Sequence, residues 1–143
     1  LLLYAYYPFS AQYSVALRWW QEVINGEELI GFPHEVTFGF VRLAINSRLG
    51  EAAVSLDQAR EVVEAWLQLP QTRILLPDEN LFSRVMDLMR SASAAGAMLS
   101  DAVLASYAIA NRAVLHSNDA DFSRFRGLKW ENPPNEAQRS RVG

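Results

Sequence analysis

The sequence contains no cysteine, only two histidines and a single lysine among its 143 residues. The absence of cysteine excludes disulfide bonds and thiolate metal sites, so a reducing cytoplasm is the expected compartment. No apolar run reaches the roughly 18 residues that a membrane-spanning helix needs. Residues 1–3 are apolar, but they lack the basic start and the small-residue cleavage site of a signal peptide.

The motifs of several large enzyme classes are also absent. There is no Gly-x-Ser-x-Gly motif, no cysteine nucleophile and no glycine-rich phosphate-binding loop. His34 and His116 do not make a convincing triad or zinc site, so we assign them structural roles. The net charge of −3 excludes an overall positive field that would attract nucleic acid. All but one of the 13 basic residues are arginine, which grips phosphate well, although genome composition explains this bias equally.

The sequence does contain enough apolar material for one substantial core. Its composition, 50% hydrophobic and 20% charged, is ordinary for a globular domain of this length. Apolar residues at helical spacing alternate with short apolar runs, which is typical of an α/β fold with a parallel sheet covered on both faces. The predicted helices cover residues 10–25, 34–45, 55–69, 79–95 and 99–112, and the predicted strands cover residues 29–32, 74–76, 113–117 and 128–130.

Three aspartates follow or begin elements in the second half of the chain. Asp101 lies in the first turn of the last predicted helix, and Asp119 and Asp121 come directly after the strand that follows this helix. Ligand sites of α/β proteins lie at the carboxyl ends of strands. Carboxylates gathered there repel one another, and a divalent cation is the usual way to relieve that repulsion.

Each of these aspartates also has a plain structural explanation. Ser100 could cap the helix with Asp101 in its first turn. The segment Asn118-Asp119-Ala120-Asp121 could simply be a turn, since Asn and Asp favour turns. The residues alone therefore leave a metal site and these structural roles open.

Glu35 is the only carboxylate in the predicted helix over residues 34–45. It could be a surface residue that complements the helix dipole. That helix is apolar nearly all round, however, so we expect it to be buried. Buried glutamates are rare unless they are paired or metal-bound, so we expect Glu35 to face the acidic cleft. Gly39 inside this helix costs about 1 kcal/mol relative to alanine, so we expect another segment to approach it closely.

The order of these segments resembles the PIN-domain ribonucleases, most closely the toxin subunits of bacterial VapBC toxin–antitoxin pairs. The resemblance spans residues 1–133. The family's third and fourth acidic motifs resemble residues 99–102 and 117–125, its Phe-Leu-Arg…Asn-Pro-Arg stretch resembles residues 40–48, and its first helix and closing strand resemble residues 2–6 and 127–133.

The resemblance implies a three-layer α/β/α PIN-like fold with a short, mainly parallel central sheet. It implies a PIN-like domain over residues 1–133, and residues 134–143 read as a disordered tail. The implied function is a cytoplasmic endoribonuclease toxin that hydrolyses RNA phosphodiesters with Mg²⁺ or Mn²⁺ and is neutralised by a cognate antitoxin. A homodimer is also expected, for which Tyr13 and Trp19 are loosely indicated contact residues.

Carried onto this sequence, the resemblance implies metal-binding and catalytic roles for four acids, and arginines that contact phosphate. Hard oxygen ligands favour Mg²⁺ or Mn²⁺ over zinc. Two of the acids match the motifs best, and the arginines could instead be surface residues that aid solubility. The best-matched acids are Asp101 and Asp119, the other two are Asp121 and Glu35, and the arginines are Arg42, Arg48, Arg124 and Arg126.

The sequence departs from the family pattern at two acids. Many relatives carry the second acid one helical turn later, where this chain has Gly39, but Glu35 lies four residues earlier on the same helix face. The first acid belongs to an Asp-x-Asn strand just ahead of the residues that match Leu1 to Leu3, and we expect that strand to be missing here. Either the sequence is clipped or the protein lacks one ligand. The alternatives to a toxin are a non-catalytic PIN-like interaction module and a PIN nuclease of RNA processing without an antitoxin.

Overall fold

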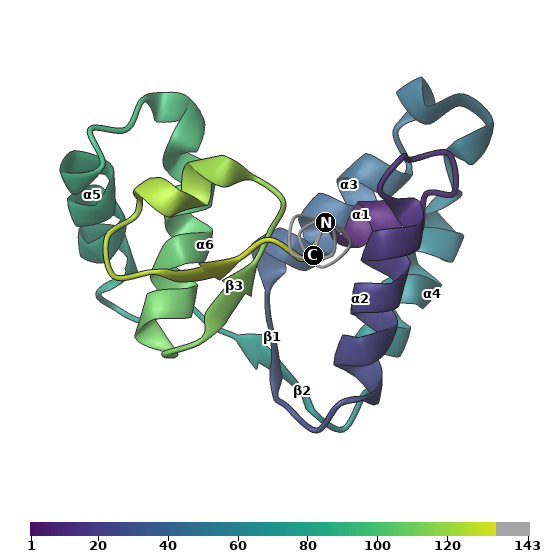
Figure 1. The fold of residues 1–143 in the computed structure, drawn as a ribbon, viewed down its shortest axis with the longest axis horizontal. Helices are drawn as coiled ribbons and strands as arrows, with labels where there is room; N and C mark the ends of the chain where they lie inside the picture. The colour runs from purple at the N-terminus through teal and green to yellow at the C-terminus, as the bar shows by residue number, and fades with distance from the viewer. Residues whose placement is uncertain (134–143) are drawn as a thin grey trace, which may run out of the picture. The chain divides into compact units, whose positions relative to one another are not determined.

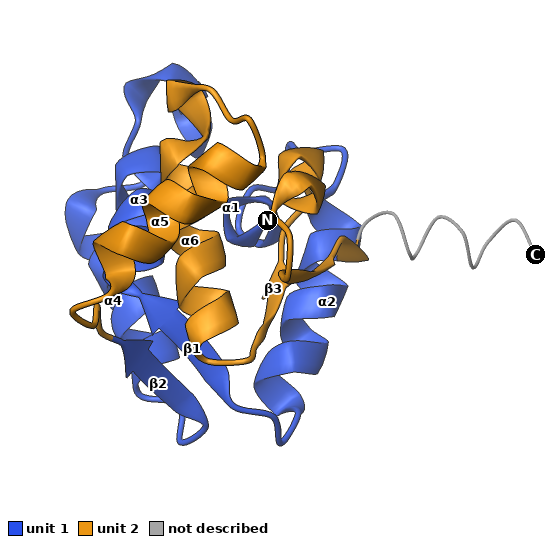
Figure 2. Ribbon diagram, turned by 90° about the vertical axis from the view of Figure 1, so that its left-hand side faces the viewer, with its two compact units in different colours: residues 1–75 blue, residues 76–143 orange. Residues whose placement is uncertain are grey.

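The computed structural model describes residues 1–133 as two compact units (Figure 1; Figure 2). Unit 1 covers residues 1–75, and unit 2 begins at Leu76. The predicted tail over residues 134–143 lies outside the described residues. Within residues 1–133, no helix has the length and apolar character needed to span a bilayer.

Unit 1 is mainly helical around one pair of parallel strands. Strand β1 (Ile30–Pro33) pairs with β2 (Thr72–Leu75), with Ile30 opposite Thr72. Helix α4 (Leu56–Leu67) begins at a capping box, in which Ser55 and Gln58 each accept the other's backbone N–H. The remaining elements of the unit are α1 (Leu2–Ala5), α2 (Tyr13–Asn25), α3 (His34–Ala44) and the 3₁₀ segment η1 (Ser47–Ala52).

Aromatic side chains form the centre of the unit 1 core. Trp66 stacks on Phe32 with ring centroids 5.7 Å apart and meets Phe40 edge-on at 4.6 Å. The hydroxyl oxygen of Tyr6 accepts hydrogen bonds from the indole Nε1 of Trp20 at 3.1 Å and of Trp66 at 2.8 Å. Both tryptophans are buried, so one phenol oxygen satisfies two buried donors.

Helix α3 buries only one face, contrary to the expectation from its apolar composition. Phe40 and Ala44 are buried, whereas Phe38 is 71% exposed. A Cβ added at Gly39 would meet no heavy atom of the described chain within 4 Å. The expected close approach to this glycine is therefore absent. The apolar composition of α3 predicted burial on all sides wrongly, because the sequence does not distinguish an apolar side chain on the solvent face from one in the core.

Unit 2 places the second strand pair beside two packed helices (Figure 2). Strand β3 (Val114–His116) runs parallel to β4 (Lys129–Glu131), with Val114 opposite Lys129. The other elements are α5 (Leu81–Ser91), η2 (Gly96–Met98), α6 (Leu99–Ala110) and η3 (Ala120–Arg124). Its core is made of Val85, Leu88, Met98, Ala102, Ala105, Phe122 and Phe125.

Parallel pairing in both units confirms the predicted α/β class. Among the described residues the strands form two separate two-stranded sheets, β1–β2 and β3–β4. Strands β1 and β2 are separated along the chain by α3, η1 and α4, and β3 and β4 by the connection that contains η3, which gives each parallel pair the crossover that it requires. The predicted helices are confirmed, most of them with ends within a few residues of those expected.

Helices α5 and α6 both end in a Schellman motif whose left-handed residue is not glycine. The backbone φ angle is +47° at Ser93 and +53° at Arg112. After α5, Ala94 N–H donates to the carbonyl of Met89 at 2.9 Å, and Ser93 N–H donates to that of Arg90 at 3.1 Å. A side chain in this conformation costs about 1–2 kcal/mol. Helix α5 therefore ends at Ser91, four residues before the predicted end, and the left-handed Ser93 follows its C-cap.

Arg84 ties α5 to α6 and to the loop before α5. Its Nε donates to the hydroxyl of Ser106 at 3.1 Å, and its terminal nitrogens donate to the Asp78 carboxylate at 3.0 and 2.9 Å. The hydrogen bonds from Arg84 and from the backbone of Asn80 hold the pKa of Asp78 below its ordinary value. Ser106 is fully buried in α6, so this contact fixes one side of the helix that carries Asp101.

Tyr6→Phe tests the shared acceptor in the unit 1 core. We expect the free energy of unfolding to fall by about 1–3 kcal/mol, because the substitution leaves buried indole donors without an acceptor. Urea unfolding followed by tryptophan fluorescence measures the change. Tyr7→Phe is the matched control, since the Tyr7 hydroxyl takes no part in these bonds. Equal losses in the two variants would contradict this account.

Candidate active site

Asp101 lies in the first turn of α6 and is half-buried. The cap expected at Ser100 is absent, because α6 continues directly from η2 and its N-cap is Met98, which makes no side-chain cap bond. Ser100 therefore lies inside the helix. The interpretation of Ser100 as a helix cap is wrong, while the placement of Asp101 in the first turn is confirmed.

Asp119 follows β3 and caps the 3₁₀ segment η3. Its Oδ1 accepts the backbone N–H of Asp121 at 2.9 Å, and its own N–H donates to the Ser117 hydroxyl at 3.1 Å. The predicted turn is thus present. It uses only part of the acceptor capacity of a carboxylate, which has about four lone-pair positions. Turn formation and cation binding by Asp119 are therefore compatible.

Strand β4 and the residue after it, Asn132, hold the loop that carries Asp119. The indole Nε1 of Trp130 donates to the carbonyl of Ser117 at 2.9 Å, and the Asn132 amide donates to the carbonyl of Asn118 at 3.4 Å. The sequence gives no signal for these two contacts, because both partners lie 13 or 14 residues further along the chain. They fix the backbone that positions the second acid of the site.

Asp101, Asp119 and Asp121 share one electrostatic neighbourhood within unit 2. Burial raises the pKa of the Asp101 carboxyl, and the negative charges of Asp119 and Asp121 raise it further. Among residues 1–133 none of the three aspartates takes part in an ion pair with a basic side chain. Their charges are therefore not compensated by the described protein. Hard, negatively charged oxygen atoms of this kind fit a divalent cation.

The acidic site is not preassembled in the described chain. Within residues 1–133 no group of three or more histidine, aspartate or glutamate side chains stands ready to hold a metal ion. The mutual repulsion of the aspartates is a physical reason for this arrangement.

Glu35 lies in unit 1, in the first turn of α3, and its side chain is exposed. The expectation that Glu35 is buried is wrong, because α3 turns this side to solvent. Its role as a ligand stays a prediction.

The candidate phosphate-binding arginines are all exposed and lie in both units. Arg42 lies in the last turn of α3 and Arg48 in η1, whereas Arg124 and Arg126 belong to unit 2. The guanidinium of Arg124 is bound to backbone carbonyls 31 and 32 residues earlier in the chain. The sequence does not reveal this contact.

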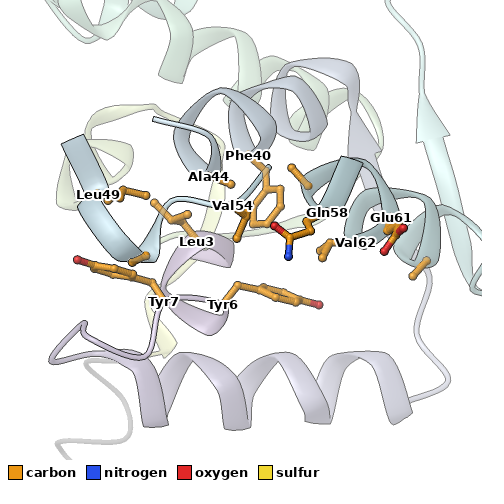
Figure 3. A pocket seen from close by; sticks show the side chains of 13 residues that line it. Leu3, Tyr6, Tyr7, Phe40, Ala44, Leu49, Val54, Gln58, Glu61 and Val62 are labelled. Carbon is orange, nitrogen blue, oxygen red and sulfur yellow. The ribbon is translucent and has the colours of Figure 1, made fainter. Parts of the chain in front are cut away.

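A pocket of about 550 Å³ in unit 1 contains none of the predicted site residues. It is lined by residues of α1, α3, η1 and α4, and Figure 3 shows apolar side chains such as Leu3, Phe40 and Val62 around it. Glu61 is its only carboxylate. A lining of this kind lacks the acidic cluster that metal-assisted hydrolysis uses.

Comparison with known proteins gives consistent matches over nearly the whole chain. The PIN domain family model matches residues 3–128, a span that includes all four candidate acids. Ribonuclease VapC33 of Mycobacterium tuberculosis is 35% identical over 136 residues, which cover 95% of each chain. Ribonuclease VapC37 of the same organism is 30% identical over 94% of this chain and 93% of its own.

A solved structure shares the fold. The crystal structure of VapBC2 from Rickettsia felis, bound to a DNA fragment from their promoter, matches with a TM-score of 0.64 and 18% identity over 92% of each chain. The helices, the parallel strands and these matches together define an α/β nuclease-like class. The chain belongs to the PIN domain family, as a VapC-type member. PIN nucleases of this type generally depend on a divalent metal ion.

Asp101→Asn should leave the melting temperature of the metal-free protein unchanged or raise it. The neutral amide has nearly the same size and lacks the charge that burial, Asp119 and Asp121 disfavour. The pKa of the Asp101 carboxyl is higher in the folded than in the unfolded chain. The protonated carboxyl therefore stabilises the fold at pH values below the unfolded-chain pKa, and this contribution is lost as the pH rises through the folded-chain pKa. The advantage of the variant should therefore grow between about pH 4, near the ordinary aspartate pKa, and neutrality.

Thermal unfolding in chelator from acid to neutral pH measures this difference. Asp57→Asn is the matched control, because Asp57 likewise lies in the first turn of a helix, α4, but is exposed. Loss of its favourable charge–dipole interaction should slightly lower the melting temperature. If Asp101→Asn lowered the melting temperature in the same way, Asp101 would be a structural helix-start residue.

Proposed function

We propose that this chain is a metal-dependent endoribonuclease, the toxin of a type II toxin–antitoxin pair. The observation that carries the proposal is the arrangement of unit 2, where Asp101 at the start of α6 is electrostatically coupled to Asp119 and Asp121 after β3. Relatives that are named ribonucleases and align over nearly the whole chain support hydrolysis of RNA as the reaction.

The three aspartates have different tasks in this proposal. Asp119 is fixed by its cap to Asp121 and by the loop contacts from β4. Asp101 supplies a half-buried carboxylate from a different element, and Asp121 adds a further acid. A divalent cation held by them would polarise the phosphoryl oxygen and lower the pKa of the attacking water. We propose Mg²⁺ or Mn²⁺, because the donors are hard oxygens.

Glu35 and the arginines remain proposed site residues because of the family resemblance. Glu35, in the first turn of α3, stays a candidate fourth ligand. Arg42, Arg48 and Arg126 are exposed and are the candidate contacts to RNA phosphates. Arg124 belongs to this set only if it leaves its carbonyl partners.

An antitoxin is the proposed protein partner, supported by the VapBC structure that shares this fold. We also propose a homodimer that acts in the cytoplasm. The aromatic residues that loosely motivate a dimer, Tyr13 and Trp19, are half-buried rather than exposed, so they give it little support. Light scattering at micromolar concentration separates a dimer from a monomer of 16.1 kDa.

One observation favours the non-catalytic alternative, a PIN-like interaction module. No three-acid group ready for a metal ion exists among residues 1–133. A module that only binds a partner would need no such group. RNA cleavage by the purified protein separates the two functions.

The protein is expected to cleave an unstructured RNA with Mg²⁺ or Mn²⁺ and to lose this activity in chelator. Asp101→Asn should lower the cleavage rate by at least about a hundredfold, since even outer-shell partners of metal sites cost about 10–100-fold. Rates are measured on the full chain at fixed metal and RNA concentrations.

Asp57→Asn is again the control, because it makes the same chemical change at another helix start and should leave the rate unchanged. Glu35→Gln shows separately whether α3 supplies a ligand. If the folded wild-type protein fails to cut RNA in the presence of either Mg²⁺ or Mn²⁺, the result would support the non-catalytic module. Cleavage that survives Asp101→Asn would remove Asp101 from the site.

A further inference from the structure

Arg124, the last residue of η3, touches two other segments of unit 2. Its Nη2 donates to the carbonyl oxygens of Ala92 at 3.0 Å and Ser93 at 3.4 Å, and its Nη1 lies 3.0 Å from the sulfur of Met98. Ala92 is the C-cap of α5, and Met98 is the N-cap of α6. One guanidinium therefore joins the end of α5, the start of α6 and η3.

The contacts to Ala92 and Ser93 stabilise a strained helix end. Ser93 has the left-handed φ of +47°, which is unfavourable for a residue with a side chain. The carbonyl groups at a helix C-terminus carry partial negative charge, and a cation beside them is favourable. Arg124 thus holds the loop in a conformation that Ser93 alone disfavours.

The same residue connects the two elements that carry the acids. Asp101 follows Met98 by three residues, and Asp121 precedes Arg124 by three residues within η3. Phe122 and Phe125 pack in the core with α6, but apolar burial is non-directional. The planar guanidinium is directional, so it restricts how η3 lies against the start of α6.

We propose that Arg124 is a positioning residue for the acidic site, which sets the separation of Asp101 from Asp119 and Asp121 through its contacts to the loop before α6. The proposal rests on the proposed metal-dependent function. It gives Arg124 a task other than phosphate binding, because both terminal nitrogens face protein atoms. Asp101 lies in the first turn of α6, whereas Asp119 and Asp121 belong to η3 and its cap, so the affinity for a cation depends on how these two elements are held against each other.

Arg124→Gln tests the proposal through metal affinity. The dissociation constant for Mn²⁺, measured from the free-ion electron paramagnetic resonance signal without RNA, should rise about tenfold, at the lower end of outer-shell effects. Cleavage should fall at low Mn²⁺ and recover at high Mn²⁺, with the KM for RNA unchanged. Arg90→Gln is the control, because Arg90 is an exposed arginine in the last turn of α5 whose ion pair among residues 1–133 is with Asp87. Its Mn²⁺ affinity should match that of the wild type.

Ser93→Gly separates positioning from a purely structural role. Arg124→Gln should lower the melting temperature, and glycine at position 93 should restore it, because glycine adopts a positive φ without strain. In the double variant we expect the melting temperature to recover while the Mn²⁺ affinity stays weakened. Hydrogen exchange of residues 92–98 in the metal-free protein should likewise stay faster than in the wild type.

The other outcomes overturn the proposal in distinguishable ways. A raised KM for RNA with unchanged Mn²⁺ affinity would make Arg124 a phosphate contact. Recovery of both stability and Mn²⁺ affinity on adding Ser93→Gly would make it a helix cap only. Unchanged Mn²⁺ affinity in Arg124→Gln, with tight binding by the wild type, would refute positioning and leave the proposed function intact. A wild-type protein that neither binds Mn²⁺ nor cuts RNA would refute the proposed function itself, and the positioning role with it.

Discussion

The Asp101 carboxylate, whose charge is disfavoured by burial and by the nearby Asp119 and Asp121, is the constraint that the contacts of unit 2 have to accommodate. Burial and two like charges already raise the pKa of Asp101. The surrounding contacts do not neutralise these charges. They hold neighbouring segments of unit 2 instead: Trp130 binds the carbonyl of Ser117, just before Asp119, and Arg124 binds the carbonyl of Ala92, before α6. Carboxylates without a positively charged partner lower the stability of the folded protein when no cation is bound, but they keep the capacity to bind one.

The fold was largely predictable because its elements carry local signals. Helix α4 begins at Ser55 with Gln58 three residues later, which is a capping box legible in the sequence. The alternation of short apolar strands with helices gave the parallel pairing of β1 with β2 and of β3 with β4. The end of α5 at Ser91 was harder to predict, since its left-handed residue is a serine rather than the usual glycine.

The site was predictable only in part, because some of its features depend on contacts between distant residues. The three aspartates could be predicted as candidate site residues from their positions at the ends of helices and strands. The burial of Glu35 was predicted wrongly, since composition does not show which face of α3 meets solvent. The partners of Arg124 and of Trp130 lie in other segments, and no local pattern in the sequence indicates them.

The charge distribution gives the proposed cation a second purpose. The chain has a net charge of −3, so its overall field opposes the approach of a polyanion. Arg124 makes no ion pair with these acids among residues 1–133, because its guanidinium is bound to backbone carbonyls and a sulfur. A cation at the aspartates would reduce the local negative charge where the phosphodiester has to bind. Binding of RNA and assembly of the acidic site would then depend on the same ion, and an arginine that brings the acids together would influence both without touching the substrate.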